Sequence, residues 1–249
     1  MIKQDNIEFQ ANLYESSNPT RRWIHKKRRD WVIKQLVRFS SKDKSVLEVG
    51  TGCGIYTTTL VNLYGSVTTI DINPEFVQYA KCSLPTVESH VANIETYSDS
   101  KKHDVILMTE VIEHVNNTKL SLKSVYENIK PGGVFILTTP NKFSTTELVA
   151  RLLKIQIFAV IARKIYREPV DELGHINLRT RGELIKEINQ TGFTIESRSD
   201  ISFYLPVIAE WGGERGVSML KFTEKHFSKT SILSHLLWTQ CYVLRKAQI

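Results

Sequence analysis

The chain has 249 residues, of which 41% are hydrophobic and 24% charged, a globular composition that excludes wholesale disorder. Its formal net charge of +7 at pH 7 allows an anionic partner, such as a nucleic acid or a membrane surface. No apolar run reaches the ~18 residues of a membrane span, and the N-terminus lacks a secretory pattern. The three cysteines are far apart and favour neither a disulfide scaffold nor a zinc site. We therefore expect a cytoplasmic protein.

The first half of the chain predicts a helix followed by a regular alternation of strands and helices. Residues 1–20 are polar with a loop at 16–19, and Arg21–Phe39 has apolar residues near helical spacing. The expected strands are Ser45–Gly50, Ser66–Asp71, Val87–Ala92, Asp104–Met108 and Val134–Thr138, and the expected helices are Ile55–Tyr64, one opened by Pro74, and Leu120–Ile129. Pro131-Gly132-Gly133 is expected to form a turn. Such an alternation indicates parallel pairing in a doubly wound α/β sheet.

The second half is less regular. Thr180 and Glu183 form a capping box that opens a helix, which should end before Gly192. Strands are expected at Phe193–Ser199 and Gln240–Leu244. The segments 144–168 and 202–230 do not fit the alternation, and we expect them to be insertions over the open edge of the sheet, where substrate binds.

The sharpest motif is a glycine-rich loop between the first strand of the alternation and the next helix. Gly50, Gly52 and Gly54 sit at alternate positions, and Asp71 ends the following strand about 20 residues later. Glycines allow a tight turn with positive φ, the helix start offers free N–H groups, and the acid can hold both ribose hydroxyls. A purely structural turn is the alternative. The dinucleotide fingerprint would place its third glycine at Ile55, so pyrophosphate binding is disfavoured.

The motifs of residues 40–200 resemble those of class I S-adenosylmethionine-dependent methyltransferases. The resemblance is carried by Glu48-Val49-Gly50-x-Gly52-x-Gly54 with Asp71, Ala92-Asn93-Ile94, Asp104-Val105-Ile106-Leu107, Glu110-Val111-Ile112-Glu113-His114-Val115, Lys130-Pro131-Gly132-Gly133, and Gly174-His175 through Gly192-Phe193. The Glu-His pair and the later pattern are most similar to the ubiquinone-biosynthesis O-methyltransferase branch. One departure is Asn93, where many members have Asp.

The resemblance implies a fold, a domain organisation and a cofactor site. The fold would be Rossmann-like, with a mostly parallel seven-stranded sheet, helices on both faces and an antiparallel last strand. The chain, 1–249, would be one methyltransferase domain, with an N-terminal basic helical segment at 1–39 and a cofactor-binding core at 40–200. S-adenosylmethionine would contact Glu48, Gly50, Thr51, Gly52, Asp71, Ile72, Asn93, Ile94 and Thr109. Glu48 would face the methionine end, and Ile72 would pack on adenine.

Glu110, Glu113 and His114 would share one face if a helical turn forms there. One interpretation is an acidic first turn that suits the helix dipole. A second makes His114 the general base of the reaction. A third makes the trio a divalent-metal site, because the resembling enzymes associate this pattern with magnesium, although a histidine ligand suits manganese or zinc better. His175 is a second candidate near the acceptor pocket, or else a loop histidine bound to backbone.

Two basic segments suggest partners. Arg21, Arg22, Lys26, Lys27, Arg28 and Arg29 accompany Trp23 and Trp31, a pattern that could bind nucleic acid but more often is a solvated helix face. Residues 148–167 combine apolar positions with basic ones, which fits a buried helix, a roof over a greasy pocket or a helix on an anionic membrane. We expect methyl transfer to an oxygen of a small-molecule or lipid-linked acceptor, with peripheral membrane contact through 148–167. An RNA methyltransferase and a non-catalytic cofactor-binding protein are the alternatives.

Overall fold

The computed structural model describes residues 4–153, 177–230 and 232–248. Within these ranges the strands form a seven-stranded sheet in the order β3-β2-β1-β4-β5-β7-β6. The strands are β1 (Ser45–Val49), β2 (Ser66–Asp71), β3 (Glu88–Val91), β4 (His103–Thr109), β5 (Ile129–Pro140), β6 (Phe193–Ile201) and β7 (Thr239–Lys246). The first five pair in parallel, and β7 is antiparallel to both of its neighbours. The expected fold class, with its antiparallel last strand, is confirmed.

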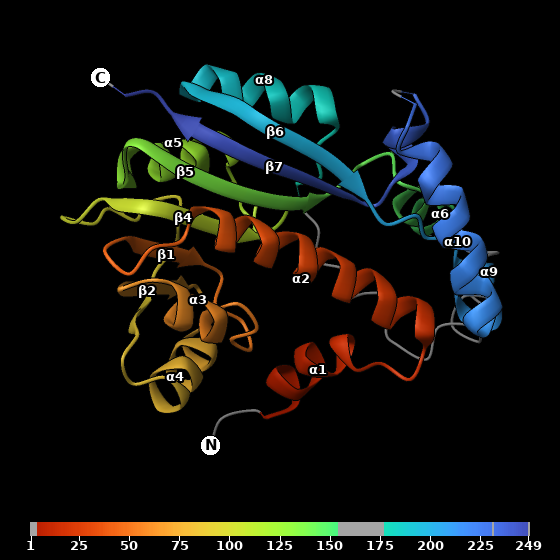
Figure 1. Ribbon diagram of the computed structural model, residues 1–249, viewed down its shortest axis with the longest axis horizontal. Helices are drawn as coiled ribbons and strands as arrows, with labels where there is room; N and C mark the ends of the chain where they lie inside the picture. The colour runs from red at the N-terminus through yellow and green to blue at the C-terminus, as the bar shows by residue number, and fades with distance from the viewer. Residues whose placement is uncertain (1–3, 154–176, 231, 249) are drawn as a thin grey trace.

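Helices cover both faces of this sheet (Figure 1). They are α1 (Gln4–Tyr14), α2 (Pro19–Phe39), α3 (Thr57–Leu63), α4 (Pro74–Ser83), α5 (Thr118–Asn128), α6 (Thr145–Leu153), α8 (Arg181–Thr191), α9 (Pro206–Trp211) and α10 (Gly213–Phe227). Alternate strand residues enter two separate cores because side chains along a strand point to opposite faces. Leu47 and Ile106 pack with α5 and α8, whereas Val46 and Leu107 pack with α2 and α3.

Side-chain caps define the starts of α2, α4 and α8. The Asn18 side chain accepts from the first amides of α2, and the Asn73 side chain does the same for α4, where Pro74 is the first helical residue. The capping box of Thr180 with Glu183 is present at α8, and Gly192 ends that helix in the left-handed conformation with φ 99°. The predicted helix start at Pro74, the capping box of Thr180 with Glu183 and the helix end before Gly192 are confirmed.

Three local expectations differ from the structure. The polar residues before the loop at 16–19 include helix α1. The helix after the glycine loop begins at Thr57 instead of Ile55. Pro131-Gly132-Gly133 lies inside β5 and not in a turn before it, and the pairing of β4 with β5 jumps from Ile129 to Val134, so these residues bulge out of the ladder.

The second predicted insertion, 202–230, contains α9 and α10. Both helices pack against α2, around a cluster that includes Ile24, Phe203, Leu220 and Leu237. This places them beyond the end of the sheet at which β6 ends (Figure 1). Of the first predicted insertion, only the part up to the end of α6 is described. Most of segment 148–167 and all of the loop with His175 lie outside the described residues.

None of the described helices is long and apolar enough to span a membrane.

Candidate functional site

A cavity of about 480 Å³ lies at the carboxyl ends of the parallel strands. The loops after β1, β2, β3 and β4 line it, and helices α1 and α2 add Gln10, Leu13, Tyr14 and Arg28. Strand order changes direction between β1 and β4, and such a switch point is where open α/β sheets bind ligands. Gly50, Thr51, Gly52, Asp71, Ile72, Asn93, Ile94 and Thr109 all line the cavity, as does His114.

The glycine loop is shaped by close packing. Gly50 has φ 84°, and a Cβ there would lie 2.4 Å from Cγ2 of Val111, so only glycine fits without displacing the loop after β4. Two amides of the loop itself already have partners within the protein. The Gly52 amide donates to Oδ2 of Asp71 at 3.1 Å, and the Cys53 amide donates to Oε1 of Gln10 at 3.0 Å. Helix α1 therefore covers the loop through a side chain.

Asp71 lies at the end of β2 with its carboxylate directed to the glycine loop. Besides Gly52, it accepts the Asn73 amide at Oδ1 over 2.9 Å. Burial raises the pKa of Asp71, and the backbone N–H donors oppose that rise. Across the cavity, Oδ1 of Asn93 accepts the Glu95 amide at 2.9 Å, which holds the amide group at the cavity wall.

Glu48 is not among the residues that line the cavity. It is 2% exposed, and its Oε2 accepts the Thr57 hydroxyl at 2.6 Å. The Thr57 hydroxyl is in turn 3.2 Å from that of Thr51. Burial raises the pKa of Glu48 to about 8, although hydrogen bonds from Thr57 and Thr69 lower it. Glu48 therefore supports the glycine loop from behind as a neutral carboxyl at pH 7.

Of the acidic trio after β4, Glu110 and His114 line the cavity, and Glu113 is buried with its Oε1 3.9 Å from Nε2 of His114. The residues form a turn closed by the His114 amide and the Val111 carbonyl at 2.9 Å, not a helix. Glu113 is 1% exposed in its side chain and His114 47%. Thr139 donates to Oε2 of Glu113 at 2.9 Å, whereas His114 lines the cavity. Burial raises the pKa of Glu113 well above its usual range, and the Glu110 carboxylate adds to this shift.

The trio does not fit a divalent metal. A hard cation needs several oxygens on one site, but Oε2 of Glu110 contacts Arg28 and Oε2 of Glu113 accepts the Thr139 hydroxyl. Nowhere in the described ranges do three or more His, Cys, Asp or Glu side chains form a group that could hold a metal. The metal interpretation of Glu110, Glu113 and His114 therefore has no support in the geometry.

Arg28 is the site residue that sequence patterns did not single out. It projects from α2 into the cavity wall, and its Nη1 lies 2.7 Å from Oε2 of Glu110. Burial by itself lowers the pKa of Arg28, but the Glu110 carboxylate raises it above its usual value. Glu110 also accepts the Thr138 hydroxyl at 3.0 Å and adopts φ 54°, a conformation that favours glycine.

The other cations of the α2 cluster are also paired. Arg21 contacts Glu210 at 3.1 Å, and Lys26 contacts Glu15 at 3.0 Å. The remaining pairs are Arg22 with Glu214, Lys27 with Glu224, and Arg29 with Asp30. The tryptophans pack beside the cores, Trp23 with the α9–α10 cluster and Trp31 with the α2–α3 face. Most of these cations therefore pair α2 with other segments, Arg29 pairs within α2, and the run is not a free basic stripe.

Comparison with known proteins agrees with this site. A family model described as a methyltransferase domain matches residues 21–198. The ubiquinone biosynthesis O-methyltransferase of Pelagibacter ubique is 30% identical over 124 residues, which cover 48% of this chain and 48% of that protein. The mitochondrial enzyme of the same name from Schizosaccharomyces pombe is 32% identical over 127 residues, covering 48% of this chain and 45% of that protein. The chain thus spans about half the length of the curated relatives it matches.

Solved structures share the fold at low sequence identity. The N-methyltransferase NodS from Bradyrhizobium japonicum, in complex with S-adenosyl-L-homocysteine, has a TM-score of 0.60 at 13% identity and covers 98% of this chain and 95% of its own. An S-adenosylmethionine-dependent methyltransferase from Mesorhizobium loti has a TM-score of 0.59 at 12% identity, covering 88% of this chain and 98% of its own. Both similarities concern the architecture alone.

Proposed function

Because the chain belongs to the methyltransferase domain family, we propose that it transfers a methyl group from S-adenosylmethionine to an oxygen atom of a small-molecule or lipid-linked acceptor. The observation that carries the proposal is the cavity at the strand switch point, where the glycine loop, Asp71 and the loop after β3 meet. The ubiquinone O-methyltransferases that resemble the chain favour oxygen as the methylated atom.

The lining residues suit the parts of the cofactor. The Asp71 carboxylate would accept hydrogen bonds from the ribose hydroxyls. Such charge-assisted hydrogen bonds contribute about 1.5–3 kcal/mol each. Ile72 is exposed in the cavity and would pack on the adenine ring, whose amino group would donate to Asn93. Arg28 is the only arginine or lysine among the described lining residues. It would bind the carboxylate of the methionine moiety, while Glu110 fixes its guanidinium.

When bound, the cofactor supplies an electrophilic methyl group on a sulfonium centre. The protein has to hold the acceptor oxygen in line with that group and exclude water, which provides most of the rate. His114 would accept the proton of the acceptor hydroxyl, because it lines the same cavity as the glycine loop and is half-exposed. His175 remains a predicted second acceptor-side residue and lies outside the described part of the chain.

Each of the six basic residues in the run at 21–29 contacts a carboxylate, which gives no support to the RNA methyltransferase alternative, because phosphate binding needs free positive charge. The lipid-linked acceptor and the membrane contact of 148–167 rest on that segment's apolar and basic sequence. Substituting Arg151 and Lys154 by Gln and measuring sedimentation with anionic liposomes tests this contact.

The decisive experiment separates binding from transfer. Purified protein is first titrated with S-adenosylmethionine, S-adenosylhomocysteine and NAD in a calorimeter, and we expect binding of the first two only. Methyl-labelled cofactor is then incubated with small-molecule, lipid and RNA extracts, and label should enter the small-molecule or lipid fraction. Label in RNA would overturn the acceptor class, and cofactor binding without any transfer would identify a non-catalytic protein.

A further inference from the structure

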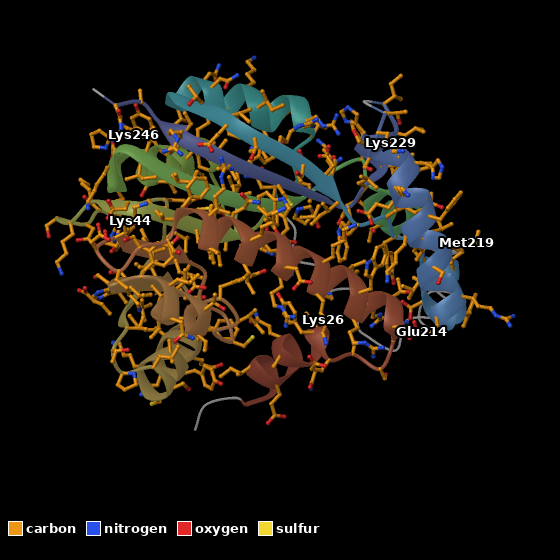
Figure 2. The ribbon with its side chains drawn as sticks, viewed as in Figure 1. Lys26, Lys44, Glu214, Met219, Lys229 and Lys246 are labelled. Carbon is orange, nitrogen blue, oxygen red and sulfur yellow. The ribbon has the colours of Figure 1, made fainter. Side chains whose placement is uncertain are left out.

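Helix α10 has large apolar side chains on its solvent-exposed side as well as on its buried side. Its inner residues, Val217 and Leu220, are buried against α2 and the adjoining cluster. Its outer residues include Met219, which is 56% exposed, and Phe222, which is 66% exposed. Figure 2 shows Met219 on the side of α10 that points away from the sheet. A soluble surface helix normally presents polar side chains there.

More exposed apolar side chains lie close by in the chain. Trp211, at the end of α9, is 65% exposed, and Ile232, just after α10, is 82% exposed. These two residues flank opposite ends of α10, and we call Met219 and Phe222, which are three residues apart on one side of the helix, the α10 face. Single exposed apolar residues are ordinary on protein surfaces, but a group of large ones in one short segment indicates a contact surface.

The charges around the α10 face are mainly basic. The two acids of α10, Glu214 and Glu224, are both engaged by cations of α2, namely Arg22 and Lys27. Arg215, Lys225 and Lys229 are exposed, and none of them forms an ion pair with any residue that the structure describes. The charges of Glu214 and Glu224 are therefore offset by cations of α2. The basic side chains that pair with no described residue leave a net positive charge beside the exposed apolar residues.

We propose that the α10 face docks on an anionic lipid surface. Trp211 and Phe222 have the amphipathic or aromatic character that favours the membrane–water interface, and basic side chains next to them attract anionic headgroups. A second copy of the chain fits less well, because a symmetric contact would bring the same cations of both copies together. The proposal does not rest on methyl transfer, since docking needs neither cofactor nor acceptor.

The test is co-sedimentation of the full chain with vesicles. We expect binding to vesicles of phosphatidylcholine with phosphatidylglycerol, release by salt, and little binding to phosphatidylcholine alone. Replacing Arg215, Lys225 and Lys229 together by Gln should weaken binding on the order of 100-fold, at about a factor of five for each cation near an anionic surface. The double variant Met219→Ser with Phe222→Ser should weaken binding at least about tenfold through lost apolar burial.

Matched controls change the same chemistry elsewhere on the surface. Lys119→Gln, Lys123→Gln and Lys186→Gln remove three exposed charges from α5 and α8, and Val37→Ser with Leu120→Ser removes two exposed apolar residues. Circular dichroism and binding of S-adenosylmethionine verify that each variant is folded.

Three outcomes would overturn the proposal. The first is equal vesicle binding by the α10 charge variant and its control. The second is wild-type binding to neutral vesicles that equals its binding to anionic vesicles. The third is a wild-type dimer that Met219→Ser with Phe222→Ser dissociates. The last result would assign the α10 face to a second copy. Because cofactor titration is a separate measurement, a failure of docking leaves the proposed methyl transfer untouched.

Discussion

The carboxyl of Glu48 should make the stability of the protein depend on pH in a defined direction. In the folded state its pKa is about 8, because burial behind the glycine loop disfavours the charged form. In the unfolded chain the pKa returns to the ordinary value of about 4.5. Between these two values the folded state holds a proton that the unfolded state has lost. Stability must therefore fall as pH rises through this window.

The size of the effect follows from the two pKa values. One pKa unit corresponds to about 1.4 kcal/mol. Integrated from pH 5 to pH 8, the loss of folding stability from this single carboxyl is at most about 3 kcal/mol. The variant Glu48→Gln removes the titration while keeping an oxygen that can accept the Thr57 hydroxyl. Relative to wild type, the variant should become more stable by about this amount on going from pH 5 to pH 8.

Urea unfolding at a series of pH values measures this difference directly. Other titrating groups, such as Glu113, are present in both proteins and cancel in the comparison. Glu127→Gln, which neutralises an exposed carboxylate of α5, is the control and should follow the wild-type curve. If Glu48→Gln and wild type lose stability in parallel from pH 5 to pH 8, the carboxyl is ionised in the folded protein and the argument from burial is wrong.

Further predictions concern the cavity. Asp71→Ala should bind S-adenosylmethionine roughly 10- to 100-fold more weakly in calorimetry, and unchanged affinity in a folded variant would contradict the ribose assignment. Arg28→Met should weaken cofactor binding and destabilise the fold by about 1–3 kcal/mol, because the half-buried Glu110 carboxylate loses its cationic partner. Adding Glu110→Gln to Arg28→Met should restore stability to urea but not cofactor binding. Recovered cofactor binding would argue against a contact between Arg28 and the methionine carboxylate. His114→Ala should lower turnover about 10²- to 10⁴-fold with cofactor affinity intact. Chelator should not affect the wild type, and full turnover in the variant would exclude the base role.

The sequence by itself determined the architecture and the glycine-loop side of the cavity. The alternation of short apolar strands with helices is a local property of the chain, and so are the glycines at 50, 52 and 54 and the helix-start residues Pro74 and Thr180. Each depends on the backbone preferences of a few neighbouring residues, so the fold class, the starts of α4 and α8 and the position of Asp71 at the cavity could be expected in advance.

Only the tertiary structure decided the directions of charged side chains. Glu110, Glu113 and His114 are spaced to share a helical face, but their strand ends in a turn, so Glu110 and His114 face the cavity while Glu113 is buried against Thr139. Arg28 looks like one member of a basic run, yet it is the one that reaches the cavity, because α2 packs across the sheet and meets Glu110. A charge is satisfied by whichever partner the fold brings near, and that partner is distant in sequence, so no local pattern encodes it.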